Sequence, residues 1–463
     1  MGSELLDSFD ELGDRVAVVH GEARHGYAEL ADRIRRLLKE LDSHGVRPHD
    51  AVVLNGDFSF ASIAALFALH LNRNVVIPVV SLTGTTLTTV IESCDPRHIL
   101  RVSHDTEPAD EAPDVTIEAV PGAAADRGER YSRLADRGAS GLVLLSSGST
   151  GVPKAILHDL DALVEEKLGR RARGGGRPSS ILMFLLFDHI GGINSLLGAV
   201  RVGGTVVVPR RRTPEEICAL IEEHRIRLLP TSPTFLNLIL IGGFHEKHDL
   251  SSLRLISYGT EPMPEELLKR VGAAFPRARL LQTFGTSETG ISTTTSESSR
   301  STYFRIEDTS VQHRIVDGEL QLKSSTQFLG YLNHPGDSLT EDGWFRTGDL
   351  VELNEGGYLR IKGRAKEVIN VGGQKVLPLE LESVLLSSPL IADCVVYGTP
   401  NAITGQSVCA DIIPRGEPTR AQMRKHVVEF LTGKLEAFKI PTKVNLVDAV
   451  TVSERFKKKR IVP

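Results

Sequence analysis

Residues 144–158 read LLSSGSTGVPKAILH and join an apolar run to a loop of small residues and a lysine. The apolar run is typical of a buried strand. The loop that follows contains Ser146, Ser147, Gly148, Ser149, Thr150 and Gly151, and Lys154 comes three residues later. Glycines let backbone N–H groups converge on phosphate oxygens, hydroxyls add donors, and lysine adds a positive charge. The segment lacks the Gly-Lys-Ser/Thr ending of a Walker loop. It therefore predicts either another kind of phosphate-binding loop or a plain Ser/Gly turn.

The chain around this loop alternates helical patterns with short β-branched runs. Residues 27–45 and 60–72 have helical patterns, whereas residues 142–146 and 203–209 are typical of buried strands. Short apolar strands that alternate with amphipathic helices predict parallel sheets covered by helices on both faces. We therefore expect an α/β fold, with mainly parallel sheets in a large N-terminal domain.

The pattern changes after about residue 303. Residues 303–358 contain short strands and turns, including a hairpin pattern around Asp317-Gly318, which predict a small β subdomain. A helix, a strand and a second helix follow Gly363 and predict a small α+β C-terminal domain. The polar GRAKE segment separates the two patterns. The sequence therefore predicts a large domain over residues 1–363, a hinge at 364–366 and a small domain over 367–463.

Composition excludes several classes of protein. The chain has 463 residues, of which 41% are hydrophobic and 24% charged, and a net charge of −5. A general nucleic-acid binder is excluded because there is no basic excess. Four separated cysteines indicate free thiols, and the acidic N-terminus lacks a signal-peptide pattern. The longest apolar stretch, ASIAALFALHL, is too short to span a membrane. We expect a cytoplasmic protein without a membrane span.

Four further segments follow the Ser/Gly loop. They read SYGTEPMP (257–264), QTFGTSETG (282–290), GWFRTGDL (343–350) and GYLRIKGRAKEVINVGGQKVLPLELE (357–382). In this order and spacing, the five segments resemble the adenylate-forming (ANL) superfamily. That superfamily contains acyl- and aryl-CoA synthetases, adenylation domains of nonribosomal peptide synthetases, and luciferases. The resemblance extends from about residue 15 to the end of the chain.

The resemblance implies a two-step ligase reaction. A carboxylate attacks the α-phosphate of ATP and gives acyl-AMP and pyrophosphate, and a thiol of CoA or of a carrier pantetheine then takes the acyl group. The loop from Ser146 to Gly151 and Lys154 is implied to hold the β- and γ-phosphates. Ser287, in place of the usual threonine, is implied to contact the α-phosphate, and Glu288 to ligate Mg²⁺, a hard cation that prefers oxygen.

Other positions are implied to hold the nucleoside. Phe284 replaces the usual tyrosine and is implied to lie against adenine, and Asp349 suits the ribose hydroxyls because a carboxylate accepts two hydrogen bonds. Arg364 is implied to add a donor to the same sugar. The remaining positions of this set are Gly259, Thr260, Glu261 and Gly285.

The C-terminal segment, VSERFKKKRIVP, departs from the family pattern T-x-x-G-K-I-x-R. Alignment of Ser453 with the threonine and Arg460 with the arginine places Lys457 at the catalytic position. Phe456 then stands where the family has glycine. Lys458 is the alternative catalytic lysine, and a solvated basic tail is the alternative to both.

The family resemblance also implies mobility of the small domain and a route for the thiol. In relatives this domain swings about a hinge, where Lys366 stands in this chain. Gly372 and Gly373 are implied to line the path of the thiol, and a simple hairpin turn is the alternative.

The acid pocket is implied at Phe187, Asp188 and His189. Asp188 stands where amino-acid-activating domains bind an amine, so an amino acid is one alternative for the substrate. The alternative role for Asp188 itself is a structural one. Residues 291–316 contain neither glycine nor proline, unlike the relatives, which predicts an unusual pocket wall.

The sequence therefore predicts an ATP- and Mg²⁺-dependent acid–thiol ligase that acts on a small-molecule carboxylic acid. The acceptor is CoA or a separate carrier protein. Three alternatives remain: transfer to an amine, which gives an amide; activation of a small oxyacid such as nitrite; and a non-catalytic nucleotide-binding protein.

Overall fold

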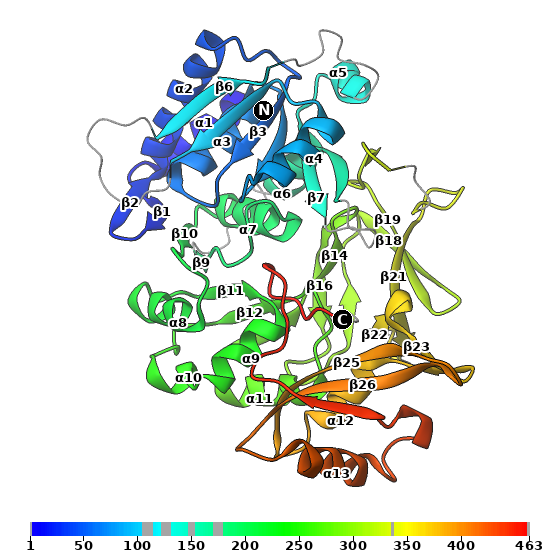
Figure 1. The fold of residues 1–463 in the computed structure, drawn as a ribbon. Helices are drawn as coiled ribbons and strands as arrows, with labels where there is room; N and C mark the ends of the chain where they lie inside the picture. The colour runs from blue at the N-terminus through cyan, green and yellow to red at the C-terminus, as the bar shows by residue number, and fades with distance from the viewer. Residues whose placement is uncertain are drawn as a thin grey trace.

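The computed structural model describes residues 2–103, 114–121, 131–146, 153–169, 179–334 and 338–460. Two mixed sheets with helices around them form the upper and middle parts of the molecule in Figure 1, and an antiparallel β subdomain lies beside them. A small domain at the bottom carries the last strands and helices. This arrangement confirms the predicted α/β class with a large N-terminal and a small C-terminal domain.

The first sheet has seven strands in the order β13-β12-β11-β9-β10-β1-β2. Only β1 and β2 are antiparallel, and every other described pair in it is parallel, as the β-branched runs predict. Its strands are β1 (Val16–His20), β2 (Ala23–Gly26), β9 (Ser180–Leu182), β10 (Thr205–Val208), β11 (Leu228–Thr231), β12 (Leu255–Tyr258) and β13 (Arg279–Gln282).

The second sheet also has seven strands, in the order β20-β8-β7-β4-β3-β5-β6. Its centre is parallel, whereas β8 pairs antiparallel with both β7 and β20. Its strands are β3 (Ala51–Asn55), β4 (Val75–Val79), β5 (His98–Val102), β6 (Val115–Ala119), β7 (Gly141–Ser146), β8 (Lys154–Asp159) and β20 (Gly330–Tyr331).

The predicted β subdomain is a six-stranded antiparallel sheet in the order β16-β17-β22-β21-β19-β18. Asp317 and Gly318 form the turn of its β18–β19 hairpin with positive φ angles of 51° and 81°. Its strands are β16 (Thr294–Ser296), β17 (Phe304–Ile306), β18 (Val311–Val316), β19 (Glu319–Ser324), β21 (Phe345–Leu353) and β22 (Leu359–Arg364). A separate hairpin joins β14 (Phe284–Thr286) to β15 (Gly290–Ser292).

The small domain begins where β22 ends, at Arg364, and the 3₁₀ turn η3 (Ala365–Glu367) follows directly. Helices α12 and α13 pack on its five-stranded sheet around a core of its own. Its elements are β23 (Ile369–Val371), β24 (Gln374–Val376), α12 (Pro378–Leu385), β25 (Ile391–Asn401), β26 (Gly405–Pro414), α13 (Arg420–Leu431), η4 (Ala437–Lys439) and β27 (Lys443–Leu446).

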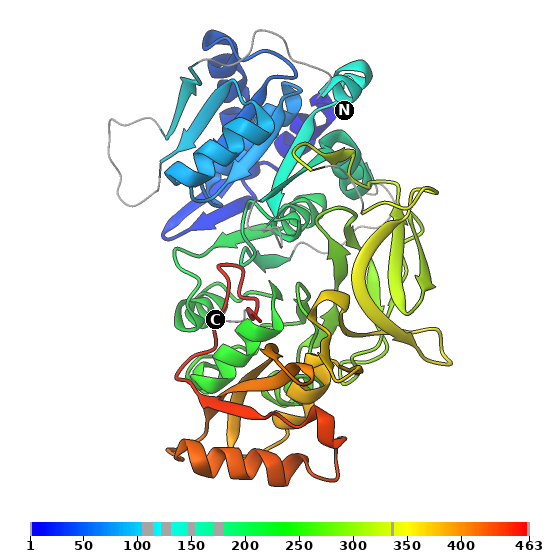
Figure 2. The same cartoon turned by 45° about the vertical axis from the view of Figure 1, so that its right-hand side comes forward.

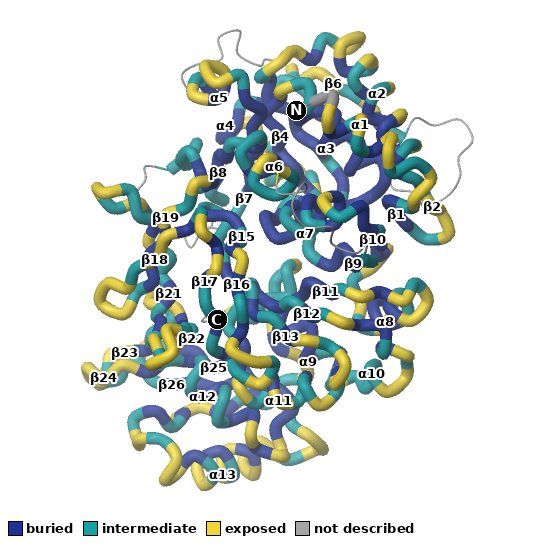
Figure 3. Tube along the Cα trace, turned by 180° about the vertical axis from the view of Figure 1, so that it is seen from behind, coloured by how far each residue is buried: buried dark blue, intermediate teal, exposed yellow. Residues whose placement is uncertain are grey.

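The helices of the large domain bury apolar faces against the sheets. In Figure 3 the buried residues lie toward the interior and the exposed ones on the outer helices and turns. Helix α2 buries one stripe that includes Leu30, Ile34, Leu37 and Leu41, whereas α3 is buried nearly all round. These helices are α1 (Gly2–Leu12), α2 (Tyr27–Ser43), α3 (Phe60–Leu71), α4 (Gly84–Cys94), α5 (Ser132–Arg137), α6 (Leu160–Leu168), α7 (Ile190–Arg201), α8 (Pro214–Glu223), α9 (Pro233–Ile241), α10 (Phe244–Lys247) and α11 (Glu265–Ala274). Within the described ranges, no helix combines the length and apolar character needed to cross a bilayer.

The chain leaves the small domain after β27 and returns to the large domain. In Figures 1 and 2 this red segment climbs from the bottom sheet toward α9 and the middle of the molecule. Near its end Val452 and Lys458 form an antiparallel bridge, and the backbone N–H of Ser453 donates to the Lys457 carbonyl over 2.8 Å. We call residues 453–457 the tail turn.

Candidate active site

The strands on either side of the Ser/Gly loop form the phosphate side of the candidate site. Ser146 is the last residue of β7 and pairs in register with Lys154, the first residue of β8. Five loop positions of the sequence analysis lie outside the described residues: Ser147, Gly148, Ser149, Thr150 and Gly151. The ends of β7 and β8 nevertheless place Ser146 and Lys154 next to each other on neighbouring strands of the second sheet.

Lys154 and Glu288 meet at a tyrosine that the sequence analysis did not identify. The Lys154 Nζ lies 4.6 Å from the ring centroid of Tyr331 in β20. The Tyr331 hydroxyl donates to Glu288 Oε1 over 3.0 Å. Because β20 pairs with β8, this edge strand joins the loop lysine to the acid of the QTFGTSETG segment. Tyr331 belongs to the GYLN segment. The one sequence feature that could have indicated it as a site residue is an aromatic side chain directly after a glycine.

The buried side chain of His158 contacts the turn that contains Ser287 and Glu288. The His158 side chain is fully buried, and its Nε2 lies 2.6 Å from the Ser287 carbonyl oxygen. Burial lowers the pKa of His158 to about 4, so the imidazole is neutral at pH 7. A carbonyl only accepts, so Nε2 carries the proton and donates to Ser287. His158 thereby fixes the turn without adding a charge to it.

Asp349 and Arg364 form a pair across β21 and β22. The Arg364 Nε donates to Asp349 Oδ1 over 3.1 Å, and the two residues are register partners. Asp349 is 5% exposed, whereas half of the Arg364 side chain is exposed. Burial raises the pKa of Asp349, and the arginine opposes this shift. The pair gives this edge a carboxylate acceptor and a guanidinium donor side by side.

The SYGTEPMP segment follows the end of β12. Gly259 packs so tightly that an added Cβ would lie 2.5 Å from Thr283 Oγ1, which explains the glycine. Thr260 has a positive φ of 71°, and its buried Oγ1 has no hydrogen-bond partner among the described residues. A β-branched residue in this conformation is strained, and such strain is concentrated at functional sites.

Glu261 accepts two backbone hydrogen bonds from separate parts of the chain. Its Oε1 accepts from Thr234 N over 2.7 Å at the start of α9, and its Oε2 accepts from Lys458 N over 3.2 Å in the tail. Burial raises the pKa of Glu261, and these hydrogen bonds oppose the shift. Glu261 therefore attaches the tail to the large domain in addition to any contact with a nucleotide.

Phe284 lies in the core of the β subdomain. Its ring stacks on Phe304 with centroids 5.6 Å apart, and the residue is 6% exposed. The next residue, Gly285, faces the Gly290 carbonyl so closely that a Cβ would lie 2.2 Å from that oxygen. One face of the Phe284 ring thus has a structural partner, and the glycine allows the tight β14–β15 hairpin.

The tail turn brings Lys457 into this region. Burial lowers the pKa of Lys457 to about 8, and the cations Arg364 and Arg455 lower it further, whereas Glu261 and Asp349 oppose the shift. The ammonium group of the small domain therefore lies within electrostatic reach of Glu261 and Asp349 of the large domain and of Arg364 at the domain boundary.

Lys458 points elsewhere. Its Nζ donates to Asp393 Oδ1 over 2.5 Å and to the Cys394 carbonyl over 2.8 Å, both in the small domain. The Lys458 and Asp393 side chains are 8% and 1% exposed, so this is a buried ion pair. The geometry therefore favours Lys457 over Lys458 as the lysine available to a ligand.

The predicted acid pocket lies at the start of α7. Phe187 is fully buried and packs edge-on against Phe58 with centroids 4.8 Å apart. His189 is the N-cap of α7, and its Nδ1 accepts from Gly191 N over 3.1 Å. Burial lowers the pKa of His189 well below its usual value, and Lys457 and Arg455 lower it further, so the ring is neutral.

Asp188 and Arg455 interact electrostatically beside this N-cap. Burial raises the pKa of Asp188, and Arg455 opposes that shift. The Asp188 Oδ1 is buried and has no hydrogen-bond partner among the described residues. The Arg455 Nη2 donates to the Leu145 carbonyl over 3.0 Å, next to Ser146. Arg455 therefore connects the tail turn to the start of the Ser/Gly loop, a role that no motif indicated.

The predicted hinge and thiol-path residues lie on exposed turns. Lys366 is exposed on η3. Gly372 and Gly373 are exposed and form the turn between β23 and β24 with φ angles of 58° and 87°, which favour glycine. In the described conformation, this pair has the geometry of a simple hairpin turn.

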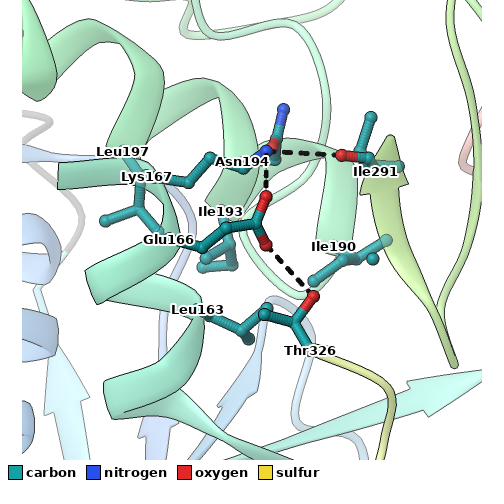
Figure 4. Close-up of a pocket in the computed structure, with 10 residues that line it drawn as sticks. Leu163, Glu166, Lys167, Ile190, Ile193, Asn194, Leu197, Ile291 and Thr326 are labelled. Atoms are coloured by element: carbon teal, nitrogen blue, oxygen red, sulfur yellow. Dashed lines mark hydrogen bonds and ion pairs between the residues drawn. The ribbon is translucent and has the colours of Figure 1, made fainter. Parts of the chain in front are cut away.

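A small hollow lies between α6, α7 and β15 (Figure 4). Its polar side chains largely pair with one another or with backbone, because Thr326 Oγ1 donates to Glu166 Oε2 over 3.1 Å and Lys167 Nζ donates to the Ile291 carbonyl over 3.3 Å. Its free space is close to that of one water molecule, too little for an acid substrate. The lining residues are Leu163, Glu166, Lys167, Ile190, Ile193, Asn194, Leu197, Gly290, Ile291 and Thr326.

The site therefore combines cations, neutral histidines and one carboxylate placed at the phosphate side. Such a set stabilises negative charge on a ligand rather than supplying a covalent nucleophile. Among the described residues, no group of three or more His, Cys, Asp or Glu side chains is arranged to hold a metal ion. A single carboxylate such as Glu288 suits Mg²⁺ when phosphate oxygens and water complete the coordination.

Two family models match the chain. The model described as AMP-binding enzyme matches residues 7–332, and the model described as AMP-binding enzyme C-terminal domain matches residues 380–457. The first match alone covers more than half of the chain, and the second ends at Lys457.

Curated proteins and a solved structure resemble the chain along much of its length. It is 28% identical to 2,3-dihydroxybenzoate-AMP ligase of Bacillus subtilis (strain 168), over 97% of this chain and 90% of that protein. It is 29% identical to peroxisomal OPC-8:0-CoA ligase 1 of Arabidopsis thaliana, over 70% of this chain but only 63% of that protein. The fold matches that of ATP-bound MatB from Rhodopseudomonas palustris with a TM-score of 0.79 and 22% identity, over 98% of this chain and 97% of that one.

Proposed function

Because the chain belongs to the AMP-binding enzyme family, we propose that it uses ATP to convert a carboxylic acid into an acyl- or aryl-adenylate and pyrophosphate. A thiol then attacks the acyl carbon, which forms a thioester and releases AMP. Membership of this family confirms the resemblance drawn from the five motifs and, with it, the predicted ligase class. The names of the two curated relatives support the two steps, since one is an AMP ligase and the other a CoA ligase.

The observation that carries the proposal is the position of Lys457. The small domain supplies this lysine, yet its ammonium group interacts electrostatically with Asp349 and Glu261 of the large domain and with Arg364 at the domain boundary. A cation in that position binds where negative charge develops as a carboxylate oxygen approaches the α-phosphate. Lys457 is thus proposed to bridge the carboxylate and the nucleotide.

The phosphate side is proposed to hold the triphosphate. Lys154 begins β8 directly after the loop and adds a positive charge there, and Ser287 is proposed to contact the α-phosphate through its hydroxyl. Glu288 would hold Mg²⁺, which supplies neutralisation of charge on the phosphate oxygens. The hydrogen bond from Tyr331 leaves the second carboxylate oxygen of Glu288 for this ligand.

The nucleoside is proposed to bind between the subdomain edge and the end of β12. Asp349 is proposed to accept from ribose hydroxyls, and the hydrogen bond from Arg364 opposes the rise in pKa that burial causes in this carboxyl. The unpartnered hydroxyl of Thr260 supports a polar contact in the same place. Adenine is proposed to lie beside Gly259, Glu261, Phe284 and Gly285.

The acid is proposed to bind beside the start of α7. Phe187 supplies an apolar wall and the neutral His189 a hydrogen-bonding ring, while Asp188 and Arg455 set opposite charges next to it. Lys457 and Arg455 of the tail turn are thus both proposed to lie beside the bound acid. A small-molecule carboxylic acid fits this arrangement of charge.

The acceptor is proposed to be the thiol of CoA or of the pantetheine of a separate carrier protein. Lys366 is the proposed hinge residue, and Gly372 and Gly373 are proposed to line the thiol path once the small domain has turned. We further propose that the reaction takes place in the cytoplasm and serves biosynthesis. A Gly373→Trp change is then expected to leave pyrophosphate release intact and to reduce thioester formation with CoA, because an indole obstructs a narrow path.

The deciding experiment mixes the protein with ATP, Mg²⁺ and a panel of aryl, fatty, amino and small oxyacids. Acid-dependent pyrophosphate release, with acyl-AMP identified by mass spectrometry, is the expected result. Thioester formation after CoA is added distinguishes the thiol ligase from the alternatives. Acyl-AMP that gives amides with amines but no thioester with CoA or a carrier would make the protein an amide ligase. No acid-dependent pyrophosphate release would overturn the proposal.

A further inference from the structure

The tail turn contains an aromatic residue in a conformation that favours glycine. Phe456 precedes Lys457 and has a φ of 50°, in the left-handed region. Bulky residues rarely adopt this conformation, because Cβ then approaches the backbone too closely. An unfavourable backbone conformation persists only where surrounding contacts hold it, so the phenylalanine ring must make contacts that glycine could not.

The ring of Phe456 lies in an aromatic socket of the large domain. Its centroid is 5.3 Å from that of Phe184 and 5.0 Å from that of Phe235. These two partners are themselves in contact, with centroids 4.2 Å apart, and are 2% and 0% exposed. Phe184 follows β9 and Phe235 lies in the first turn of α9, so the socket belongs entirely to the large domain.

A backbone hydrogen bond holds the same residue in the socket. The Ser232 hydroxyl, which caps α9, donates to the Phe456 carbonyl over 2.9 Å and accepts from Phe235 N over 3.2 Å. Ser232 is fully buried. The socket therefore binds both the side chain and the backbone of Phe456.

The neighbours of Phe456 fix the direction of the turn. Arg455 donates to the Leu145 carbonyl, and Lys458 N donates to Glu261. Lys457 N donates to Ser453 Oγ over 3.2 Å within the turn. Lys457 thus lies between residues that contact the large domain on either side, and of these contacts only the Phe456 socket is apolar.

We propose that Phe456 is a positioning residue that docks the tail turn in the Phe184–Phe235 socket and thereby holds the Lys457 ammonium group at the reacting carboxylate and phosphate. This inference rests on the proposed function. It assigns to the ring a role that the glycine at this position in the family pattern cannot have. Docking by apolar contact leaves the charged groups of the turn free to bind the substrates.

The test compares Phe456→Gly, Phe456→Leu and a matched control in the full-length protein. Phe430→Ala is the control, because its ring stacks on His426, lies next to Lys434 and packs against the core of the small domain. Limited trypsin digestion measures docking directly, because trypsin cleaves after arginine and lysine and the turn contains Arg455 and Lys457. We expect Phe456→Gly to be cleaved in the tail several-fold faster than either the wild type or Phe430→Ala.

Adenylation kinetics read positioning. We expect Phe456→Gly to lower kcat for acid-dependent pyrophosphate release about 10- to 100-fold, with little change in the KM for ATP, because misplaced catalytic groups cost rates of this size. Phe456→Leu, which keeps an apolar side chain, should stay within about threefold of the wild type. The alkaline limb of the pH profile should move to higher pH in Phe456→Gly, because an undocked lysine regains its usual pKa.

Each outcome separates the two levels of the hypothesis. Tail cleavage in Phe456→Gly at the wild-type rate would overturn docking, and fast cleavage with unchanged kcat would overturn positioning. A Phe456→Gly protein that adenylates faster than the wild type would mean that relief of backbone strain outweighs the socket. A wild type that releases no pyrophosphate with any acid would overturn the proposed function and positioning together, whereas the digestion would still report whether the tail docks.

Discussion

The two halves of the candidate site are assembled in different ways. Lys154, Tyr331 and Glu288 belong to the large domain and are joined by neighbouring strands and a hydrogen bond. Lys457 and Arg455 arrive from the small domain on a turn held by a few contacts. The first group forms whenever the large domain folds, whereas the second also requires docking. Changes to the first should therefore alter nucleotide binding, and changes to the second should alter the rate of adenylation alone.

The largest effect is expected from Lys457→Ala. The substitution removes a cation that meets charge developing in the transition state, which typically costs about 10²- to 10³-fold in rate. We expect a loss of this size in acyl-AMP formation, measured by pyrophosphate release. ATP affinity, measured by calorimetry, should change little, because the large domain supplies the remaining nucleotide contacts.

The neighbouring lysine provides the contrast. Lys458→Met leaves Asp393 buried without its partner, and breaking a buried pair in this way costs about 3–5 kcal/mol of stability. We therefore expect a lower Tm for Lys458→Met and an unchanged Tm for Lys457→Ala. Normal adenylation by Lys457→Ala together with a stable but inactive Lys458→Met would mean that the register is off by one residue.

Glu288→Gln tests the phosphate side. The amide keeps the shape and the hydrogen bond from Tyr331 but loses the charge that Mg²⁺ selects. A loss of about 100-fold in Mg²⁺-dependent turnover is expected, because even outer-sphere partners of a metal contribute about 10- to 100-fold. Titration of activity with Mg²⁺ measures it. Preserved turnover with a large drop in Tm would make Glu288 structural and contradict the proposal.

The fold was predictable because its signals are local. The periodicity of α2, the continuous apolar run of α3 and the short apolar runs of β7 and β10 appear within one segment each. The Asp317-Gly318 turn likewise follows from two neighbouring residues. Patterns of this kind are set by burial of one face and need no knowledge of the partner element.

The candidate site was predictable only where a motif marks it. The pairing of Asp349 with Arg364 follows from the register of β21 and β22, and both positions stood in motifs. Tyr331 and His158 act through residues far away in the sequence, so no spacing indicates them. Phe456 was visible only as a departure from the family pattern, and its socket required the tertiary structure.

The pH dependence of activity distinguishes a docked lysine from a solvated one. Lys457 is charged below its pKa of about 8 and neutral above it. We therefore expect kcat/KM for ATP, which reports the free enzyme, to fall about tenfold per pH unit above pH 8. In Lys457→Arg this decline should disappear, because a guanidinium stays protonated. A wild-type profile that stays flat to pH 10 would mean that Lys457 is not held in the site.

The smallest effect is expected from Tyr331→Phe, which removes one hydroxyl from the phosphate side. The ring next to Lys154 remains, whereas the hydroxyl's contacts with Glu288 Oε1 over 3.0 Å and with Ser338 Oγ over 3.2 Å are lost. A bond of this kind contributes about 0.5–1.5 kcal/mol, or about 2- to 10-fold in an equilibrium constant. We expect the Mg²⁺ concentration for half-maximal activity to rise by that factor, because Glu288 loses its orientation. Tyr303→Phe is the matched control, because Tyr303 donates in the same way to Glu352 in the β subdomain, outside the site. An equal rise in this Mg²⁺ concentration in both variants would mean that Tyr331 acts only through the stability of the protein. The phosphate side would then be less rigid than its contacts within one domain indicate.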